Sequence, residues 1–173
     1  MRSLDFQREE NYKEYLRLLQ NDDYYDVTFD ENSGGMSAVH KLHKFSKQFG
    51  DYGMRRGDYE KTVLDVMRQN GYRIILDAEP NMPGVKSCDG YLNDVRMEIK
   101  AIEGMGPWTV AKKLHCAEKQ QAECVILYFP EELLYSPLRV SEGIRLFCSG
   151  LNNSKAVHLA RFLVVVQNRL IRF

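Results

Sequence analysis

Glu98 and Lys100 stand two residues apart in a stretch that alternates apolar and polar residues. In an extended strand, side chains with this spacing point to the same face, roughly 7 Å apart along the chain, which is about the span of a phosphate with its flanking oxygens. A carboxylate beside an ammonium is suited to phosphodiester chemistry. The alternative is a surface ion pair on a half-exposed sheet, which has little energetic consequence.

Residues 88–102 indicate a β-hairpin that turns at Asn93-Asp94. Its second arm would carry residues 95, 97, 99 and 101 on one face and residues 96, 98, 100 and 102 on the other. The hairpin would bring Asp89 back toward Glu98 and Lys100. We therefore take Asp89, Glu98 and Lys100 as candidate catalytic residues.

Two of the four histidines and three lysines fall within residues 40–47. If this segment is helical, His40, His43, Lys44 and Lys47 share one face. Such a face could bind phosphate, and His43 could act as a general acid or base. The alternative is a solvated basic face with histidines stacked on Phe45.

Pro107 suits the first turn of a helix, and the apolar spacing that follows predicts a helix over residues 108–121. Its polar faces carry Thr109, Lys112, Lys113 and Gln120. Because the helix directly follows the Glu98/Lys100 strand, it could turn a polar edge toward the same pocket. The alternative, a solvated helix surface, fits Lys112 and Lys119 better than it fits Thr109 or Gln120.

The rest of the chain predicts an α+β fold, with helices packed on a small, mainly antiparallel or mixed sheet that ends in a hairpin. Asn32-Ser33-Gly34-Gly35 is the best linker candidate, so we expect an accessory helical segment over residues 1–35 and the main domain over residues 36–173. The expected helices cover residues 4–20, 59–70 and 131–149, and the expected strands cover 24–29, 72–76, 124–129 and 157–166, with a closing turn at Gln167-Asn168.

The 173 residues suffice for one ordinary domain, and 44% hydrophobic with 28% charged residues is a globular composition. The 24 basic and 24 acidic side chains cancel, so nucleic-acid binding would need local clustering of charge. The four cysteines have no CxxC spacing, which argues against a zinc site and favours a reducing compartment. We expect neither a signal peptide nor a membrane-spanning segment.

Several ordered features resemble the C-terminal nuclease domains of bacterial polymorphic toxins, especially the transfer-RNA-cleaving toxins of contact-dependent growth inhibition, and related domains at the ends of phage head-morphogenesis proteins. The resemblance covers about the last 115 residues. It rests on Cys88-Asp89-Gly90, Met97-Glu98-Ile99-Lys100, Ala117-Glu118-Lys119-Gln120, Val125-Ile126-Leu127 and the hairpin at Gln167-Asn168.

Those toxins are grouped with the barnase, EndoU, colicin and RelE ribonucleases, which cut RNA without a metal cofactor. The resemblance implies attack by the ribose 2′-hydroxyl, with Lys100 stabilising the phosphorane-like state and Glu98 or a histidine of residues 40–43 as the base. It implies that Thr109, Lys113 and Gln120 hold phosphate or ribose. We add Thr109 and His43 to the candidate catalytic residues and take His40, Lys112, Lys113 and Gln120 as candidate substrate-binding residues. Transfer RNA is then the expected target and an immunity protein the expected partner. The site of action would be the cytoplasm, after delivery within a larger toxin or phage protein.

Two alternatives stay open. Asp89 followed by Glu98-Ile99-Lys100 also resembles the PD-(D/E)xK nuclease signature, with Glu60 as the extra carboxylate on the preceding helix. That resemblance implies Mg²⁺ on Asp89 and Glu98, with Lys100 orienting or activating the attacking water. The order helix, three strands, helix, strand fits this family too. The second alternative is an inactive nucleic-acid-binding or phage structural module.

Overall fold

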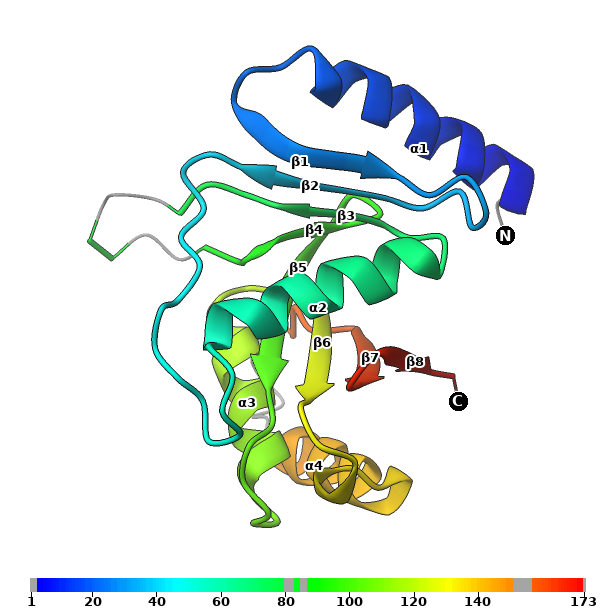
Figure 1. Cartoon of the computed structure of the whole chain (residues 1–173). Helices are drawn as coiled ribbons and strands as arrows, with labels where there is room; N and C mark the ends of the chain where they lie inside the picture. Colours follow the sequence, from blue (N-terminus) through cyan, green and yellow to red (C-terminus); the bar gives the residue numbers. More distant parts are fainter. Residues whose placement is uncertain (1–2, 80–82, 85–86, 151–156, 173) are drawn as a thin grey trace.

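The computed structural model describes residues 3–79, 83–84, 87–150 and 157–172, and within these ranges eight strands form one sheet. They lie side by side in sequence order (Figure 1). The pairs β2·β3, β5·β6 and β6·β7 are parallel, and the other four are antiparallel. The strands are β1 (Tyr24–Phe29), β2 (Met36–His40), β3 (Arg73–Leu76), β4 (Gly90–Leu92), β5 (Val95–Ala101), β6 (Cys124–Phe129), β7 (Arg161–Val166) and β8 (Arg169–Ile171).

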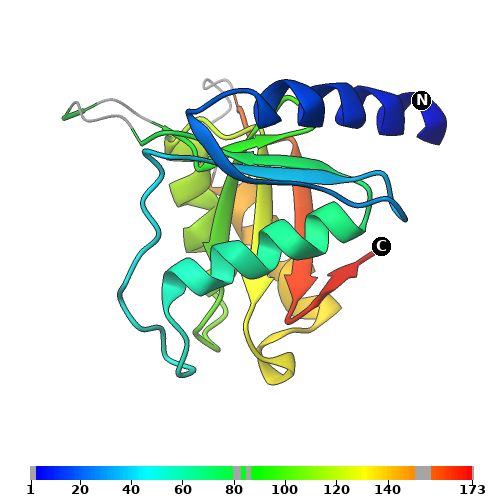
Figure 2. The same ribbon diagram turned by 45° about the horizontal axis from the view of Figure 1, so that its top comes forward.

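Helices cover both faces of this sheet. α2 (Arg56–Gln69) crosses one face, where Val63 and Met67 pack in the same apolar cluster as Ile126 (Figure 2). α3 (Thr109–Lys119) and α4 (Pro137–Ser149) pack on the opposite face over β6 and β7. The short 3-10 helix η1 (Glu132–Leu134) lies between β6 and α4. α1 (Leu4–Leu19) covers the β1–β3 end. The predicted α+β class with a closing hairpin is confirmed.

The hairpin between β4 and β5 turns where the sequence predicted. Asn93 and Asp94 have φ angles of 47° and 69°, which is the left-handed conformation that a two-residue hairpin turn requires. The Asn93 side chain also accepts a hydrogen bond from the Arg73 N–H, and Arg73 forms an ion pair with Asp94. These contacts fix the turn against β3 and set the register of the arm that carries Glu98 and Lys100.

The segment around the first two histidines differs from the prediction. Residues 36–40 form β2, a strand the sequence analysis did not identify, and residues 41–47 are irregular rather than helical. His40 therefore ends a strand, and its ring contacts Tyr24 of β1 at 5.0 Å between centroids. Parallel pairing of β2 with β3 holds the backbone extended here, so the predicted shared face of His40 and His43 does not exist.

The segment before residue 36 is hydrogen-bonded to the rest of the sheet. β1 pairs with β2 across residues 30–35, and Gly34 and Gly35 are both buried. The Asn11 side chain of α1 donates to the carbonyl oxygens of Gly34 and Gly71. The structure describes one continuous sheet across residue 35, and the division into two segments stays a prediction.

Two further elements follow from local signals. α4 begins at Pro137, and the Ser136 hydroxyl caps it by accepting from the Arg139 N–H. The sequence predicted one helical excursion over residues 131–149, and the structure divides it into η1 and α4. Across the described residues, none of the helices combines the length and the apolar character that crossing a bilayer requires.

Candidate active site

The β4–β5 hairpin brings Asp89, Glu98 and Lys100 into one hydrogen-bonded cluster. The Asp89 N–H donates to Glu98 Oε2 at 3.0 Å, and the Ile99 N–H donates to Asp89 Oδ2 at 2.7 Å. Lys100 Nζ donates to Glu98 Oε1 at 2.5 Å. Backbone donors thus fix both carboxylates, and the acid and amine predicted from their spacing are in direct contact.

Burial makes this cluster electrostatically demanding. Glu98 is only 4% exposed and Asp89 is partly buried. Burial, followed by the negative charge of Glu98, raises the pKa of Asp89 to about 7, although the hydrogen bond from Ile99 opposes the rise. Burial alone would lower the pKa of Lys100, but Glu98 outweighs it, so the pKa of Lys100 is raised. The amine stays protonated at neutral pH while Asp89 resists ionisation.

His43 and Glu60 extend the cluster onto α2. His43 Nε2 lies 3.4 Å from Glu60 Oε2, and its Nδ1 lies 3.1 Å from the carbonyl oxygen of Asp77 at the end of β3. Burial would lower the pKa of His43, but Glu60, with a smaller contribution from Asp89, leaves it raised. The charge of Glu60 also contributes to the raised pKa of Asp89. The His43 imidazole therefore contacts both Glu60 on α2 and the backbone of Asp77, just after β3.

A pocket of about 230 Å³ opens beside these residues. It is lined by Glu60 of α2, Lys100 of β5 and Lys113 of α3, together with Ser46 from the irregular segment after β2. The pocket thus adjoins Lys100, the partner of Glu98, as a role in binding an external ligand requires. Of the residues predicted on the 108–121 helix, Lys113 is the one that reaches this pocket.

Glu103 is a site residue that the sequence analysis missed. Its carboxylate accepts hydrogen bonds from the Arg56 guanidinium at 2.9 Å, the Tyr59 hydroxyl at 3.0 Å and the Asp51 N–H at 3.0 Å. Burial, then Glu103, raises the pKa of Tyr59. Glu103 ties the loop before α2 to the end of β5. Its partners lie more than 40 residues away, so no local pattern could have identified it.

The remaining predicted residues lie outside the cluster. Thr109 begins α3 against the loop at Gly104, and Lys112 is exposed. Gln120 ends α3 at the other end of β5, where its carbonyl oxygen accepts from Arg96. His40 contacts Tyr24, as described above. Hydrogen bonds therefore join Asp89 and Lys100 to Glu98, and His43 contacts Glu60. The charge of Asp89 interacts with His43 and Glu60, and Glu60, Lys100 and Lys113 line one pocket.

The donor set around Asp89 fits a hard divalent cation. Burial and then the negative charge of Glu98 raise the pKa of Asp89, and a bound cation would offset both effects. Mg²⁺ is commonly held by one or two carboxylates plus water and phosphate oxygens. Among the described residues, no group of three or more His, Cys, Asp or Glu side chains is already gathered as a metal cage. Asp89 and Glu98 are thus the ligands that the cluster offers.

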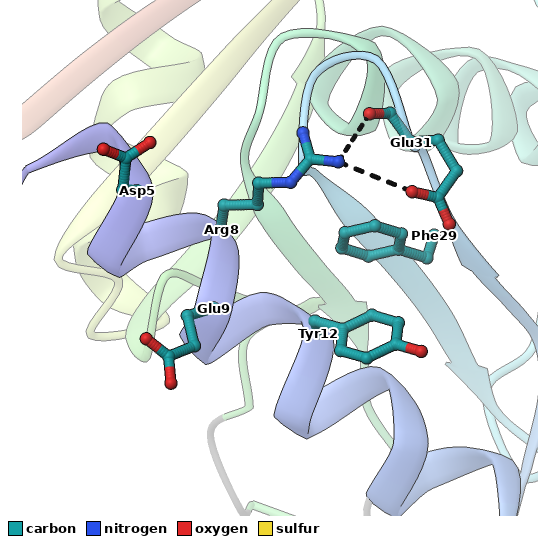
Figure 3. Close-up of a pocket in the computed structure, with 6 residues that line it drawn as sticks. All are labelled: Asp5, Arg8, Glu9, Tyr12, Phe29 and Glu31. Atoms are coloured by element: carbon teal, nitrogen blue, oxygen red, sulfur yellow. Dashed lines mark hydrogen bonds and ion pairs between the residues drawn. The ribbon is translucent and has the colours of Figure 1, made fainter.

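A second pocket, of about 360 Å³, lies between α1 and β1 (Figure 3). In it Arg8 donates to the carbonyl oxygen and the side chain of Glu31 and lies 5.8 Å above the Phe29 ring. The arginine is already paired with Glu31. We therefore place the candidate site at β5. The lining residues are Asp5, Arg8, Glu9, Tyr12, Phe29 and Glu31.

Comparison of this chain with protein-family models, with curated proteins and with solved structures finds no match.

Proposed function

We propose that this protein is a divalent-cation-dependent nuclease with a PD-(D/E)xK type of site, formed by Asp89, Glu98 and Lys100. The observation that carries the proposal is the contact of these three residues at one hairpin, where Lys100 lines a pocket together with Glu60. The element order α2, β3–β4–β5, α3, β6 also supports it, because this is the helix, three-strand, helix, strand order of that family.

Each side chain has a definite part in this proposal. Asp89 and Glu98 would hold Mg²⁺, which supplies charge neutralisation and an activated water when bound. Lys100 stays protonated, so its ammonium can donate to an oxygen of the scissile phosphate and stabilise the charge that develops in the transition state. Lys113, across the pocket, would hold a neighbouring phosphate. His43 keeps Glu60 oriented through the contact between Nε2 and Oε2.

A metal-independent ribonuclease is the second candidate. Its support is that His43 contacts Glu60 and interacts electrostatically with Asp89, so a titratable imidazole belongs to the same cluster. In that proposal the imidazole removes the proton of the ribose 2′-hydroxyl, and Lys100 stabilises the phosphorane-like state. Transfer RNA would be the first substrate to test, with an immunity protein as the partner.

The two candidates differ in their need for metal and in their products. Incubate the protein with total RNA and with DNA, in Mg²⁺ and in EDTA. Cuts that need Mg²⁺ and leave 5′-phosphates support the metal-dependent proposal. Cuts that survive EDTA and leave cyclic phosphates or 3′-phosphates reject it in favour of the ribonuclease. Intact RNA and DNA under both conditions would leave an inactive binding module.

The matched variants are Lys100→Ala and Lys119→Ala. Lys119 is an exposed lysine in the last turn of α3. We expect Lys100→Ala to lower the cleavage rate by about 100-fold or more, in the range of a lost transition-state donor, and Lys119→Ala to leave it unchanged. Equal activity of both variants would remove Lys100 from the reaction.

A further inference from the structure

Two loops form a rim beside the pocket that Lys100 lines, and each contributes a lining residue, Ser46 from the first loop and Glu103 from the second. Residues 46–55 precede α2 and residues 102–108 precede α3, and both views show them next to each other (Figures 1 and 2). Glu103 joins them, because its side chain accepts from the Asp51 N–H and the Arg56 guanidinium, and its carbonyl oxygen accepts from the Tyr52 hydroxyl. The rim is therefore held in place by hydrogen bonds.

This rim exposes large apolar side chains. Phe49 is 61% exposed and Trp108 is 54% exposed, and Met105 on the second loop is 61% exposed. Single exposed apolar residues are ordinary, but these lie on two loops that are tied together beside one pocket. The Arg55 guanidinium lies 5.6 Å from the centre of the Phe49 ring, so the aromatic ring already has a cation on it.

The same region concentrates positive charge in a chain whose total charge is zero. Residues 41–57 contain five lysines or arginines and one acidic residue. Lys41 forms an ion pair with Asp23, and Arg56 forms one with Glu103. Within the described ranges, the other three cations of this segment form no ion pair, and neither do the two lysines near the start of α3. The unpaired cations are Lys44, Lys47, Arg55, Lys112 and Lys113.

Aromatic rings beside unpaired cations match a ligand that is both apolar and polyanionic. We propose that the rim binds single-stranded nucleic acid, with unpaired bases stacking on Phe49 and Trp108 and phosphates contacting Lys112 and Lys113. Bases stack on exposed rings with little sequence preference, whereas a duplex keeps its bases stacked inside and offers only phosphates. This inference rests on the proposed function, since it names the form of nucleic acid that the site receives.

Trp108 gives a direct measurement because it is the only tryptophan in the chain. Its fluorescence is followed in EDTA while a 12-nucleotide RNA or DNA strand, the matching duplex, or inorganic polyphosphate is added. We expect both single strands to quench the emission, and the duplex and polyphosphate to quench it much less at equal phosphate concentration. RNA and DNA are compared to establish which sugar the rim prefers.

Variants separate stacking from charge. Phe49→Ala should weaken single-strand binding about tenfold, the effect of one lost base stack. Lys112→Ala should weaken it and reduce its dependence on salt, because one phosphate contact is lost. Tyr25→Ala is the control, since Tyr25 is a 41% exposed aromatic residue on β1, outside both loops of the rim. It should bind like the wild type.

Equal or tighter binding of the duplex, or quenching by polyphosphate alone, would overturn the proposal. So would a Phe49→Ala protein that binds like the wild type. Absence of any quenching would also overturn it and would point to a protein partner for the rim. Because binding is measured in EDTA, a protein that binds single strands without cleaving any substrate in Mg²⁺ refutes the nuclease proposal and leaves the rim proposal standing.

Discussion

Replacing Asp89 with asparagine tests the electrostatics of the site without changing its shape. The pKa of Asp89 rises from 3.8 to about 7, chiefly through burial and then through Glu98. At about 1.36 kcal/mol for each pH unit, keeping Asp89 ionised costs the folded state about 4 kcal/mol at pH 8. The amide oxygen can still accept from the Ile99 N–H, and the stronger bond to the ionised form is already included in this difference, because that bond opposes the rise in pKa. We therefore expect Asp89→Asn to be up to about 4 kcal/mol more stable at pH 8.

The gain should depend on pH in a definite direction. Because the pKa of Asp89 is higher in the folded protein, the folded state binds more protons than the unfolded state between about pH 4 and pH 7. The free energy of unfolding contributed by Asp89 therefore falls as the pH rises through that window. Urea denaturation in EDTA at pH 4.5, 6 and 8 would measure it, with the exposed Asp22 changed to asparagine as the control.

Two outcomes would contradict this account of Asp89. If Asp89→Asn is less stable than the wild type at pH 8, or if its advantage is the same at pH 4.5 and pH 8, burial and the charge of Glu98 do not destabilise ionised Asp89 in the folded state. The proposed cation site would then lose its electrostatic basis. A stable Asp89→Asn protein without cleavage activity would instead show that the charge of Asp89 is retained for function at the expense of stability.

Three further predictions follow from the same contacts. Mg²⁺ at a hundred times its dissociation constant should stabilise the wild type by about 2.7 kcal/mol, which is about 5–10 °C in a thermal scan, and should leave Asp89→Asn unmoved; equal shifts would place the ion elsewhere. Glu103→Ala should cost about 1–3 kcal/mol in urea because the partly exposed Arg56 and the buried Tyr59 lose their acceptor, whereas an unchanged midpoint would show that the rim stands without it. Gly90→Ala should lower the free energy of unfolding by about 2 kcal/mol or more, since a Cβ there would lie 1.9 Å from the backbone oxygen of Ile75. Gly106→Ala is the control and should be neutral, because the nearest described atom to its Cβ would be 3.5 Å away. Similar losses of stability in both variants would contradict this steric explanation.

The centre of the candidate site could be predicted from the sequence because it lies within one hairpin. Alternation along a strand is a property of the backbone, so Glu98 and Lys100 had to share a face once residues 95–101 were extended. The residues Asn93 and Asp94 favour a tight turn, and that turn brings Asp89 opposite the pair. Contacts of this range are encoded by neighbouring residues.

The segment around His43 was less predictable, since its conformation is set by distant partners. Residues 36–40 are extended because they pair with β3, which lies more than 30 residues further along the chain. His43 reaches Glu60 because the irregular segment after β2 passes over α2, whereas His40 stays at the strand end. The spacing of residues within a short window contains no information about pairing with a strand so far away, so it predicted a helix here.

Local sequence patterns predict the acid and amine on one strand, the turn that returns Asp89 and the helices that flank them, because each follows from spacing within a few residues. Which polar residues face one another depends instead on how distant segments pack. The tertiary structure placed His43 and Glu60 with the hairpin, left Gln120 at the far end of α3 and made Glu103 the junction of two loops. The physical reason is that burial and hydrogen bonding between distant segments, rather than local backbone preference, fix the surroundings of a charged group.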